Sequence, residues 1–254
     1  VVGFGGRVFK ADIEKEIAKY INTPQTMLYD KSGILYGLNN AKLAIRKQNQ
    51  CVVTEGYTDV IMCHQAGFEN TVAASGTALT SQHLNILKRY SDNLVLAFDM
   101  DIAGDSATKR GINSAQEQGF NIKIIESYLK DSDPADIILK DAKLWEEFVS
   151  QARSIMDYYF DSAFLSFDKN TPEGKREIGR IILPAIKRLQ NKIEQSYWVQ
   201  KLSESLDIKE EAVIEELIKI KISSSFSSSN SVFRSTPLFN EATTEQRKKL
   251  IEEK

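Results

Sequence analysis

Three carboxylates stand at the ends of apolar runs in this chain. Asp99 and Asp101 follow the five-residue run 94–98, and Glu55 follows the shorter run 51–54. Such runs are typical of buried strands in a parallel sheet, and open α/β sheets bind their ligands where those strands end. Asp133 and Asp136 follow the strand expected at 121–125, in a predicted turn. We therefore expect an acidic crevice at the carboxyl ends of the strands.

The chemistry open to such a cluster is the binding of a hard cation. Neighbouring carboxylates repel one another unless a cation joins them. The chain has only two histidines and two cysteines, so the acids favour Mg²⁺ or Mn²⁺, which bind a few carboxylates together with substrate phosphates. The implied substrate is a nucleotide or a nucleic acid. A lone Asp-x-Asp is more often a pair of turn or cap residues, so the prediction depends on all three strand ends together.

Composition sets the class of protein. With 254 residues, 42% of them apolar and 27% charged, the chain is typical of a soluble protein with one large or two smaller cores. We expect no membrane span and no signal peptide, and the first residue, Val1, predicts an excised fragment. Cys51 and Cys63 are too few for a disulfide framework or a zinc site, which fits a reducing cytoplasm. The net charge of −2 argues neither for nor against nucleic acid.

Strands and helices alternate over the middle of the chain. The periodicity predicts strands at 51–54, 71–74, 94–98 and 121–125, and helices at 57–67, 81–90, 103–118 and 141–150. This alternation indicates βαβ units and a mainly parallel sheet flanked by helices, an α/β fold. After residue 150 the pattern predicts only helices, at 151–168, 173–191, 193–205 and 209–221, with Pro184 kinking or splitting the second. The serine-rich segment 223–254 is a predicted flexible linker.

Two motifs carry a resemblance to a known domain. Glu55-Gly56-Tyr57-Thr58-Asp59 and Asp99-Met100-Asp101-Ile102-Ala103-Gly104 resemble the motifs of the TOPRIM domain, which bacterial primases, topoisomerases and some nucleases share. Further segments resemble the DnaG-type bacterial primases, namely Gly3–Arg7, Lys19–Thr26 with Lys31, Leu35–Leu38, Gly76–Leu79 and the helical region 151–221. The resemblance covers about residues 1–221.

The resemblance implies an activity and a set of site residues. The activity is DNA-templated synthesis of short RNA primers from ribonucleoside triphosphates. Glu55, Asp99 and Asp101 are the implied catalytic residues, Glu55 as metal ligand or proton acceptor. Mg²⁺ (or Mn²⁺) would be held by Glu55, Asp99, Asp101 and Asp133. The implied nucleotide- and nucleic-acid-binding residues are Arg7, Lys19, Asn22 and Lys31.

The resemblance also implies partners and domains. The partners are a single-stranded DNA template, ribonucleoside triphosphates, the RNA–DNA heteroduplex and a replicative helicase, the last through a missing domain beyond residue 222. Zinc is expected only in a missing upstream domain, and the bacterial cytoplasm is the expected location. The expected divisions are the end of an N-terminal basic subdomain at 1–50, a TOPRIM domain at 51–150, an all-helical subdomain at 151–222 and the linker.

Three residues depart from the family pattern, and two other functions stay open. Met100 replaces a glycine and Ile102 replaces an arginine in the second motif, while Ala135 interrupts the family's Asp-Pro-Asp. The open alternatives are another TOPRIM enzyme, a nuclease or topoisomerase, and a non-catalytic nucleic-acid-binding module. Asp59 is interpreted as a helix cap, and His83 as an ordinary helix residue.

Overall fold

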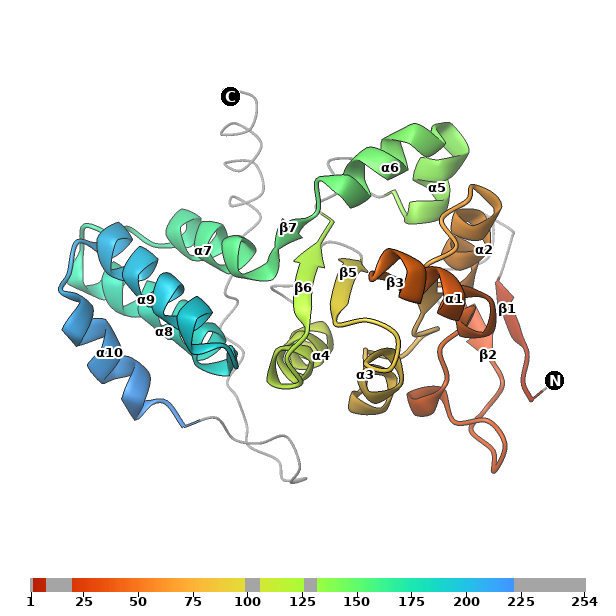
Figure 1. Ribbon diagram of the computed structural model, residues 1–254, viewed down its shortest axis with the longest axis horizontal. Coiled ribbons are helices and arrows are strands. Elements are labelled where there is room, and N and C mark those ends of the chain that lie inside the picture. Colours follow the sequence, from red (N-terminus) through yellow and green to blue (C-terminus); the bar gives the residue numbers. More distant parts are fainter. Residues whose placement is uncertain (1, 8–19, 99–105, 126–131, 222–254) are drawn as a thin grey trace, which may run out of the picture. The chain divides into compact units, whose positions relative to one another are not determined.

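The computed structural model of the chain describes residues 2–7, 20–98, 106–125 and 132–221 (Figure 1). By their contacts these residues form two compact units. The first contains residues 2–7, 20–98 and 132–150, and the second contains residues 106–125 and 151–221. The predicted linker 223–254 and the motif 99–104 lie outside the described residues. No helix in the described part of the chain is long and apolar enough to span a membrane.

Three parallel strands form the core of the first unit. Strand β3 (Cys51–Thr54) lies between β4 (Thr71–Ala73) and β5 (Asn93–Ala97), and Val53 pairs with Val72 on one side and Leu96 on the other. All residues of these strands but Asn93 are buried, as strands covered on both faces require. The strands expected at 51–54, 71–74 and 94–98 are confirmed, and with them the α/β class.

Helices surround these strands in the first unit (Figure 1). Helices α1 (Leu38–Gln48) and α2 (Tyr57–Gln65) pack against β4, and α3 (Ser81–Leu87) precedes β5. Helix α5 (Pro134–Lys140) packs against α2, and α6 (Ala142–Ser150) packs against α5. Each parallel crossover therefore runs through a helix, as the alternation of the sequence predicts.

Helix α5 corrects the prediction that Asp133 and Asp136 lie in a turn. Asp133 is the N-cap of α5, and its Oδ1 accepts a hydrogen bond from the backbone N–H of Asp136 at 2.9 Å. Pro134 occupies the first helical position, where its missing N–H is not needed. With seven residues, α5 is too short for a helical periodicity to be recognised in the sequence.

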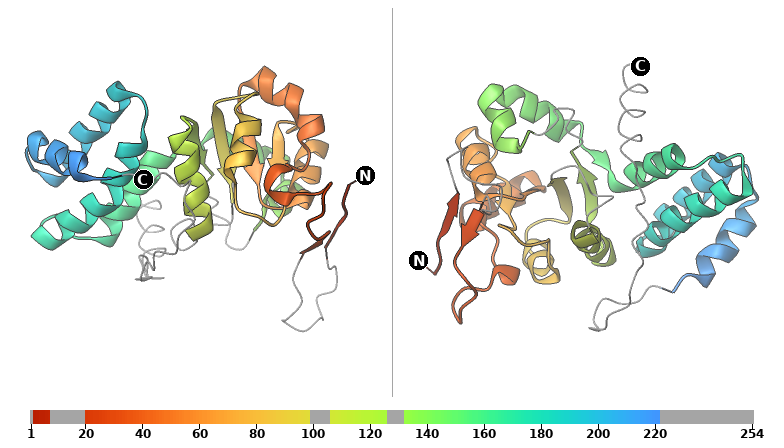
Figure 2. Two further views of the ribbon diagram at one scale, coloured as in Figure 1. Left: turned by 90° about the horizontal axis from the view of Figure 1, so that it is seen from below. Right: turned by 180° about the vertical axis from the view of Figure 1, so that it is seen from behind.

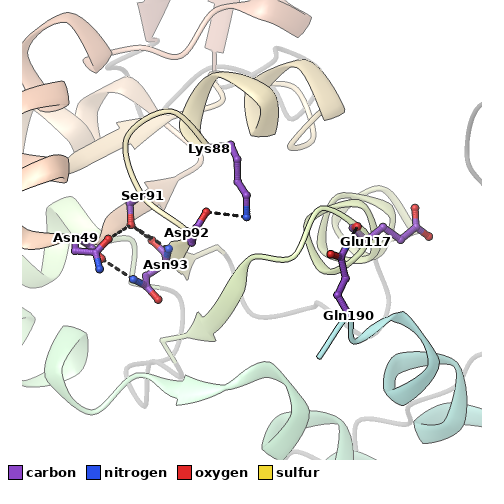
Figure 3. Close-up of polar contacts among 7 residues, drawn as sticks. All are labelled: Asn49, Lys88, Ser91, Asp92, Asn93, Glu117 and Gln190. Atoms are coloured by element: carbon purple, nitrogen blue, oxygen red, sulfur yellow. Dashed lines mark hydrogen bonds and ion pairs between the residues drawn. The ribbon is translucent and has the colours of Figure 1, made fainter. Parts of the chain in front are cut away.

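A polar network joins the end of α1 to the start of β5 (Figure 3). Asn49 ends α1 in the left-handed region, with φ of 49°. Its backbone carbonyl accepts a hydrogen bond from Asn93 Nδ2 at 2.8 Å, and its Oδ1 accepts one from Ser91 Oγ at 3.2 Å. The network fixes the start of β5, the strand that precedes Asp99 in the sequence.

The second unit is mainly helical (Figures 1 and 2). Its helices confirm the four expected after residue 150, with bounds that differ by at most four residues: α7 at Ile155–Ser166, α8 at Pro172–Arg188, α9 at Lys192–Leu206 and α10 at Glu210–Lys219. Helix α8 packs against α7, α9 and α10. Helix α8 runs on past Pro184, so this proline does not split it.

The second unit also contains two strands. Strand β6 (Asn121–Ile124) pairs with β7 (Arg153–Ser154) in antiparallel orientation, Ile124 opposite Arg153. The prediction that strands stop at residue 150 is therefore wrong, because the two-residue strand β7 follows that position. Helix α4 (Ser106–Glu117) precedes β6 and is joined to the end of α8. Gln190 Nε2 donates to the carbonyl of Glu117 (Figure 3), and Arg188 Nε lies 3.6 Å from Glu117 Oε1.

Candidate active site

A pocket opens where β3 and β5 end in the first unit. Glu55 directly follows β3, Ala97 is the last residue of β5, and Asp133 caps α5; all three line this carboxylate pocket. The other lining residues are Asn22, Gly56, Tyr57, Asp59, Ser75, Gly76 and Pro134. The structure thus brings together two of the four predicted metal ligands, Glu55 and Asp133.

The other two predicted ligands, Asp99 and Asp101, lie outside the described residues. Met100 and Ile102 lie outside them as well. The last described link to this motif is Ala97, which lines the carboxylate pocket two positions before Asp99 in the chain. The roles of Asp99 and Asp101 therefore stay predictions.

Glu55 is held through its backbone. Its side chain is exposed, and its carbonyl accepts a hydrogen bond from the backbone N–H of Ser75 at 3.1 Å. Ser75 has a left-handed φ of 53°, unusual for a residue other than glycine, and its own carbonyl accepts a hydrogen bond from Asn22 Nδ2 at 3.3 Å. A chain of polar contacts therefore runs from Asn22 through Ser75 to Glu55.

Asp59 connects the two segments that carry Glu55 and Asp133. Its side chain is 4% exposed. Its Oδ2 accepts a hydrogen bond from the backbone N–H of Gly56 at 3.1 Å, and its Oδ1 accepts one from Ala135 at 3.4 Å. The interpretation of Asp59 as a cap of α2 is confirmed, but its contact with α5 was missed. No local pattern signals a contact between residues 76 positions apart.

Among the described residues, Asn22 is a predicted nucleotide-binding residue that lines the pocket. It ends β2 (Tyr20–Asn22), which pairs with β1 (Gly5–Arg7) in an antiparallel hairpin. A Cβ atom on Gly5 would lie 2.8 Å from both Asn22 Oδ1 and Tyr57 Cε1. Glycine at position 5 therefore permits the close approach of the hairpin to the start of α2.

The other predicted binding residues are Arg7, Lys19 and Lys31. Arg7 lies in β1, opposite Tyr20, and Lys19 is outside the described residues. Lys31 begins a single helical turn (Lys31–Gly33) and is not among the residues that line the pocket. The nucleotide-binding roles of all three stay predictions.

The donor atoms of the pocket suit a hard cation. Carboxylate, amide and hydroxyl oxygens are the ligands that Mg²⁺ and Mn²⁺ prefer, and the pocket offers all three types. Within the described ranges, no group of three or more His, Cys, Asp and Glu side chains is placed to hold a metal ion. The prediction that Glu55 and Asp133 hold a metal ion together with Asp99 and Asp101 therefore stays a prediction.

His83 has a structural role that the sequence does not reveal. It is fully buried, and its Nδ1 accepts a hydrogen bond from the backbone N–H of Thr80 at 3.3 Å. Its Nε2, 2.8 Å from the carbonyl of Lys31, must then carry the proton and donate it. Both contacts suit a neutral imidazole, which ties the turn at Lys31 to the start of α3.

We expect His83 to make the chain less stable in acid. Burial lowers the pKa of His83 below its usual value of 6.5, so the unfolded chain takes up a proton before the folded chain does. Stability that is fully present above pH 6.5 should therefore fall as the pH drops towards the folded pKa. A proton NMR titration should show a His83 midpoint below 6.5, with a His64→Gln variant assigning the signal. A midpoint at or above 6.5 would contradict this expectation.

Three family models match the chain. The model described as the DNA primase catalytic core, N-terminal domain, matches residues 1–42, and the Toprim-like model matches residues 52–138. The model described as the DnaB-helicase binding domain of primase matches residues 156–211. The Toprim-like match contains Glu55, Asp99, Asp101 and Asp133, and a Toprim domain in a primase implies the use of a divalent metal.

Curated and solved relatives agree with these models. A DNA primase of Clostridium acetobutylicum is 36% identical over 217 residues, 84% of this chain and 35% of that protein. The RNA polymerase domain of Mycobacterium tuberculosis primase DnaG, solved in complex with double-stranded DNA, is 30% identical with a TM-score of 0.64, covering 82% of this chain and 67% of that chain. The chain belongs to the DnaG-type DNA primases. A DnaG primase catalytic domain bound to single-stranded DNA is 29% identical with a TM-score of 0.72, covering 84% of this chain and 67% of that chain.

Membership of the DnaG-type primases confirms the resemblance drawn from the motifs. The chain spans about a third of the length of the curated primase from C. acetobutylicum. One match differs in position from the expectation, because the helicase-binding model covers 156–211, within α7 to α10, while a helicase-binding domain was expected beyond residue 222.

Proposed function

We propose that this chain is the catalytic part of a primase, which synthesises short RNA primers on single-stranded DNA from ribonucleoside triphosphates. The observation that carries the proposal is the carboxylate pocket, where Glu55, Asp133 and the end of β5 meet at the carboxyl edge of the parallel strands. This edge is where α/β sheets bind their ligands.

The residues that would hold a metal are Glu55, Asp99, Asp101 and Asp133. Bound Mg²⁺ or Mn²⁺ supplies neutralisation of the nucleoside triphosphate and activation of the primer 3′-hydroxyl for in-line attack on the α-phosphate. Glu55 is exposed at the end of a buried strand, which lets its carboxylate reach a bound substrate and accept a proton. Asp133 is oriented by its own hydrogen bond to the first turn of α5.

The basic and amide residues near the N-terminus would bind the substrates. Asn22 lines the carboxylate pocket, and we assign it a contact to the incoming nucleotide. Lys19 and Lys31 are assigned to nucleotide phosphates and Arg7 to the template, following the family pattern. These positive charges would offset the repulsion between the triphosphate and the carboxylates of the pocket.

The domain divisions and partners follow from the same assignment. We propose the end of the basic subdomain at 1–50, the TOPRIM domain at 51–150, the helical subdomain at 151–222 and a linker at 223–254. The match at 156–211 supports contact with a replicative helicase, and zinc is assigned only to an upstream domain. The RNA–DNA heteroduplex is the product, and the bacterial cytoplasm, where such primases act in replication, is the proposed location.

The deciding experiment is a primer-synthesis assay on single-stranded DNA with and without Mg²⁺. We expect RNA products that require both Mg²⁺ and ribonucleotides and that disappear in Asp99→Ala. Asp92→Ala is the matched control, because Asp92 is an exposed partner of Lys88 on the surface (Figure 3). Retained synthesis by Asp99→Ala would contradict the proposal. Cleavage of supercoiled DNA without nucleotides would indicate a TOPRIM nuclease or topoisomerase instead, and DNA binding without metal binding would indicate a non-catalytic module.

A further inference from the structure

A second groove lies in the first unit, between the segment before α1 and helix α2. Its lining includes Tyr36, Asn39, Asn40, Val60 and His64. Gly37 forms the N-cap of α1 with φ of 82°, and a Cβ there would lie 2.6 Å from Val60 Cγ1. Close packing at Gly37 thus sets the depth of this groove, which we call the Tyr36 groove.

Tyr36 presents a fixed aromatic ring in this groove. Its side chain is 41% exposed, although its backbone is fastened to β4 by two hydrogen bonds with Ala73, at 2.9 and 3.1 Å. Its ring packs against Tyr57, with centroids 5.7 Å apart and planes at 54°. Tyr57 in turn lines the carboxylate pocket. An exposed ring on a rigid backbone is what a stacking platform for a nucleic-acid base requires.

Two amide side chains at the start of α1 line the same groove as this ring. Asn39 Nδ2 donates to Asn40 Oδ1 at 3.0 Å, an intramolecular bond that leaves Asn39 Oδ1 as an acceptor and Asn40 Nδ2 as a donor. Both residues are exposed. A neighbouring acceptor and donor match the edge of a base, which presents the same two functions in reverse.

The exposed side of α1 is basic. The helix carries Lys42, Arg46 and Lys47 and no acidic residue. Arg46 lies over the ring of Tyr90, 5.0 Å from its centroid. Lys42 and Lys47 are exposed and form no ion pair within the described part of the chain. Charge beside the Tyr36 groove therefore complements a phosphate backbone.

We propose that the Tyr36 groove binds single-stranded nucleic acid, with a base stacked on Tyr36 and its edge on Asn39 and Asn40. The phosphates that follow lie along α1, at Lys42 and Lys47. The inference rests on the proposed function for its ligand class, and it assigns a strand-binding site outside the carboxylate pocket. Tyr57 joins the two, since its ring contacts Tyr36 and borders the pocket.

The test measures the binding of fluorescently labelled single-stranded oligonucleotides to the full chain. Binding is monitored by fluorescence anisotropy in the absence of metal and nucleotides. Loss of one stacked base in Tyr36→Ala should weaken binding by about tenfold or more, while Tyr36→Phe keeps the ring and the affinity. The double variant Lys42→Ala, Lys47→Ala changes only exposed side chains, and it should reduce the slope of log affinity against log salt by about 1.4. A DNA and an RNA oligonucleotide of one sequence distinguish template from product as the bound strand.

The outcomes separate this inference from the proposed function. Asp92→Ala should bind oligonucleotides as the unaltered chain does, because Asp92 is an exposed surface residue outside the Tyr36 groove. Unchanged affinity in folded Tyr36→Ala together with an unchanged salt slope in the lysine variant would overturn the inference, even if primer synthesis is demonstrated. Weaker binding in both variants would support it, even if synthesis is absent.

Discussion

Glu55→Gln is expected to reduce primer synthesis by about 10² to 10⁴-fold, the range typical of losing a catalytic carboxylate. The amide cannot accept a proton and is a poorer ligand for a hard cation. Because the side chain is exposed and the variant keeps the backbone carbonyl that accepts from Ser75, stability should change by less than about 0.5 kcal/mol. Ribonucleotide incorporation and a thermal melt on the same preparation measure both effects.

Glu69→Gln is the matched control for this prediction. Glu69 is also an exposed acid of the first unit, but it lies before β4, away from the residues that line the carboxylate pocket. Its substitution should leave both synthesis and melting unchanged. Synthesis by Glu55→Gln at the level of Glu69→Gln would exclude Glu55 from the chemistry.

Asp59→Ala is expected to lower both stability and synthesis. Removal of the carboxylate leaves the N–H groups of Gly56 and Ala135 without this acceptor in a buried site, which costs about 2–3 kcal/mol. In a chain of this size the melting temperature should fall by roughly 4–10 °C. Synthesis should fall as well, because the segments that carry Glu55 and Asp133 lose the side chain that connects them.

Asp59→Asn is expected to have an intermediate effect. The amide oxygen keeps one acceptor, so this variant should lie between Asp59→Ala and the unaltered chain in both stability and synthesis. Asp92→Ala, which removes an exposed surface ion pair (Figure 3), should change stability by under about 1 kcal/mol. An Asp59→Ala variant with an unchanged melting temperature would show that the hydrogen bond from Ala135 of α5 to Asp59 does not contribute to stability.

The strands were predictable because their signal is local. Leu94, Val95 and Leu96 form an apolar run whose burial follows directly from its composition. The position of Glu55 at the carboxyl edge followed from the rule that α/β sheets bind their ligands where parallel strands end, whereas Asp133 lines the pocket as the cap of α5. Helix α5 was not predictable, since its start depends on Asp133 and Pro134 and its seven residues show no clear period.

Long-range polar contacts could not be predicted from local sequence patterns. Asp59 reaches Ala135, and His83 reaches the carbonyl of Lys31. The sequence indicates a helix cap at Asp59 and an ordinary helix residue at His83, and neither interpretation includes a distant partner. The Tyr36 groove could not be predicted for a related reason. Its two walls, at Tyr36 and Val60, come together only through the packing of α1 and α2 against β4.

The two compact units of the fold interleave along the chain. Residues 106–125 belong with 151–221, while residues 132–150 belong with the earlier segment 20–98. During synthesis on the ribosome, the first unit therefore remains incomplete until residue 150 has emerged, and α4 must wait longer still for its partner α8. For the same reason, a truncation at residue 150 would leave α4 and β6 without the helices and strand they pack against. Expression of either unit alone would need the intervening segment of the other unit to be removed and the two remaining segments to be joined directly.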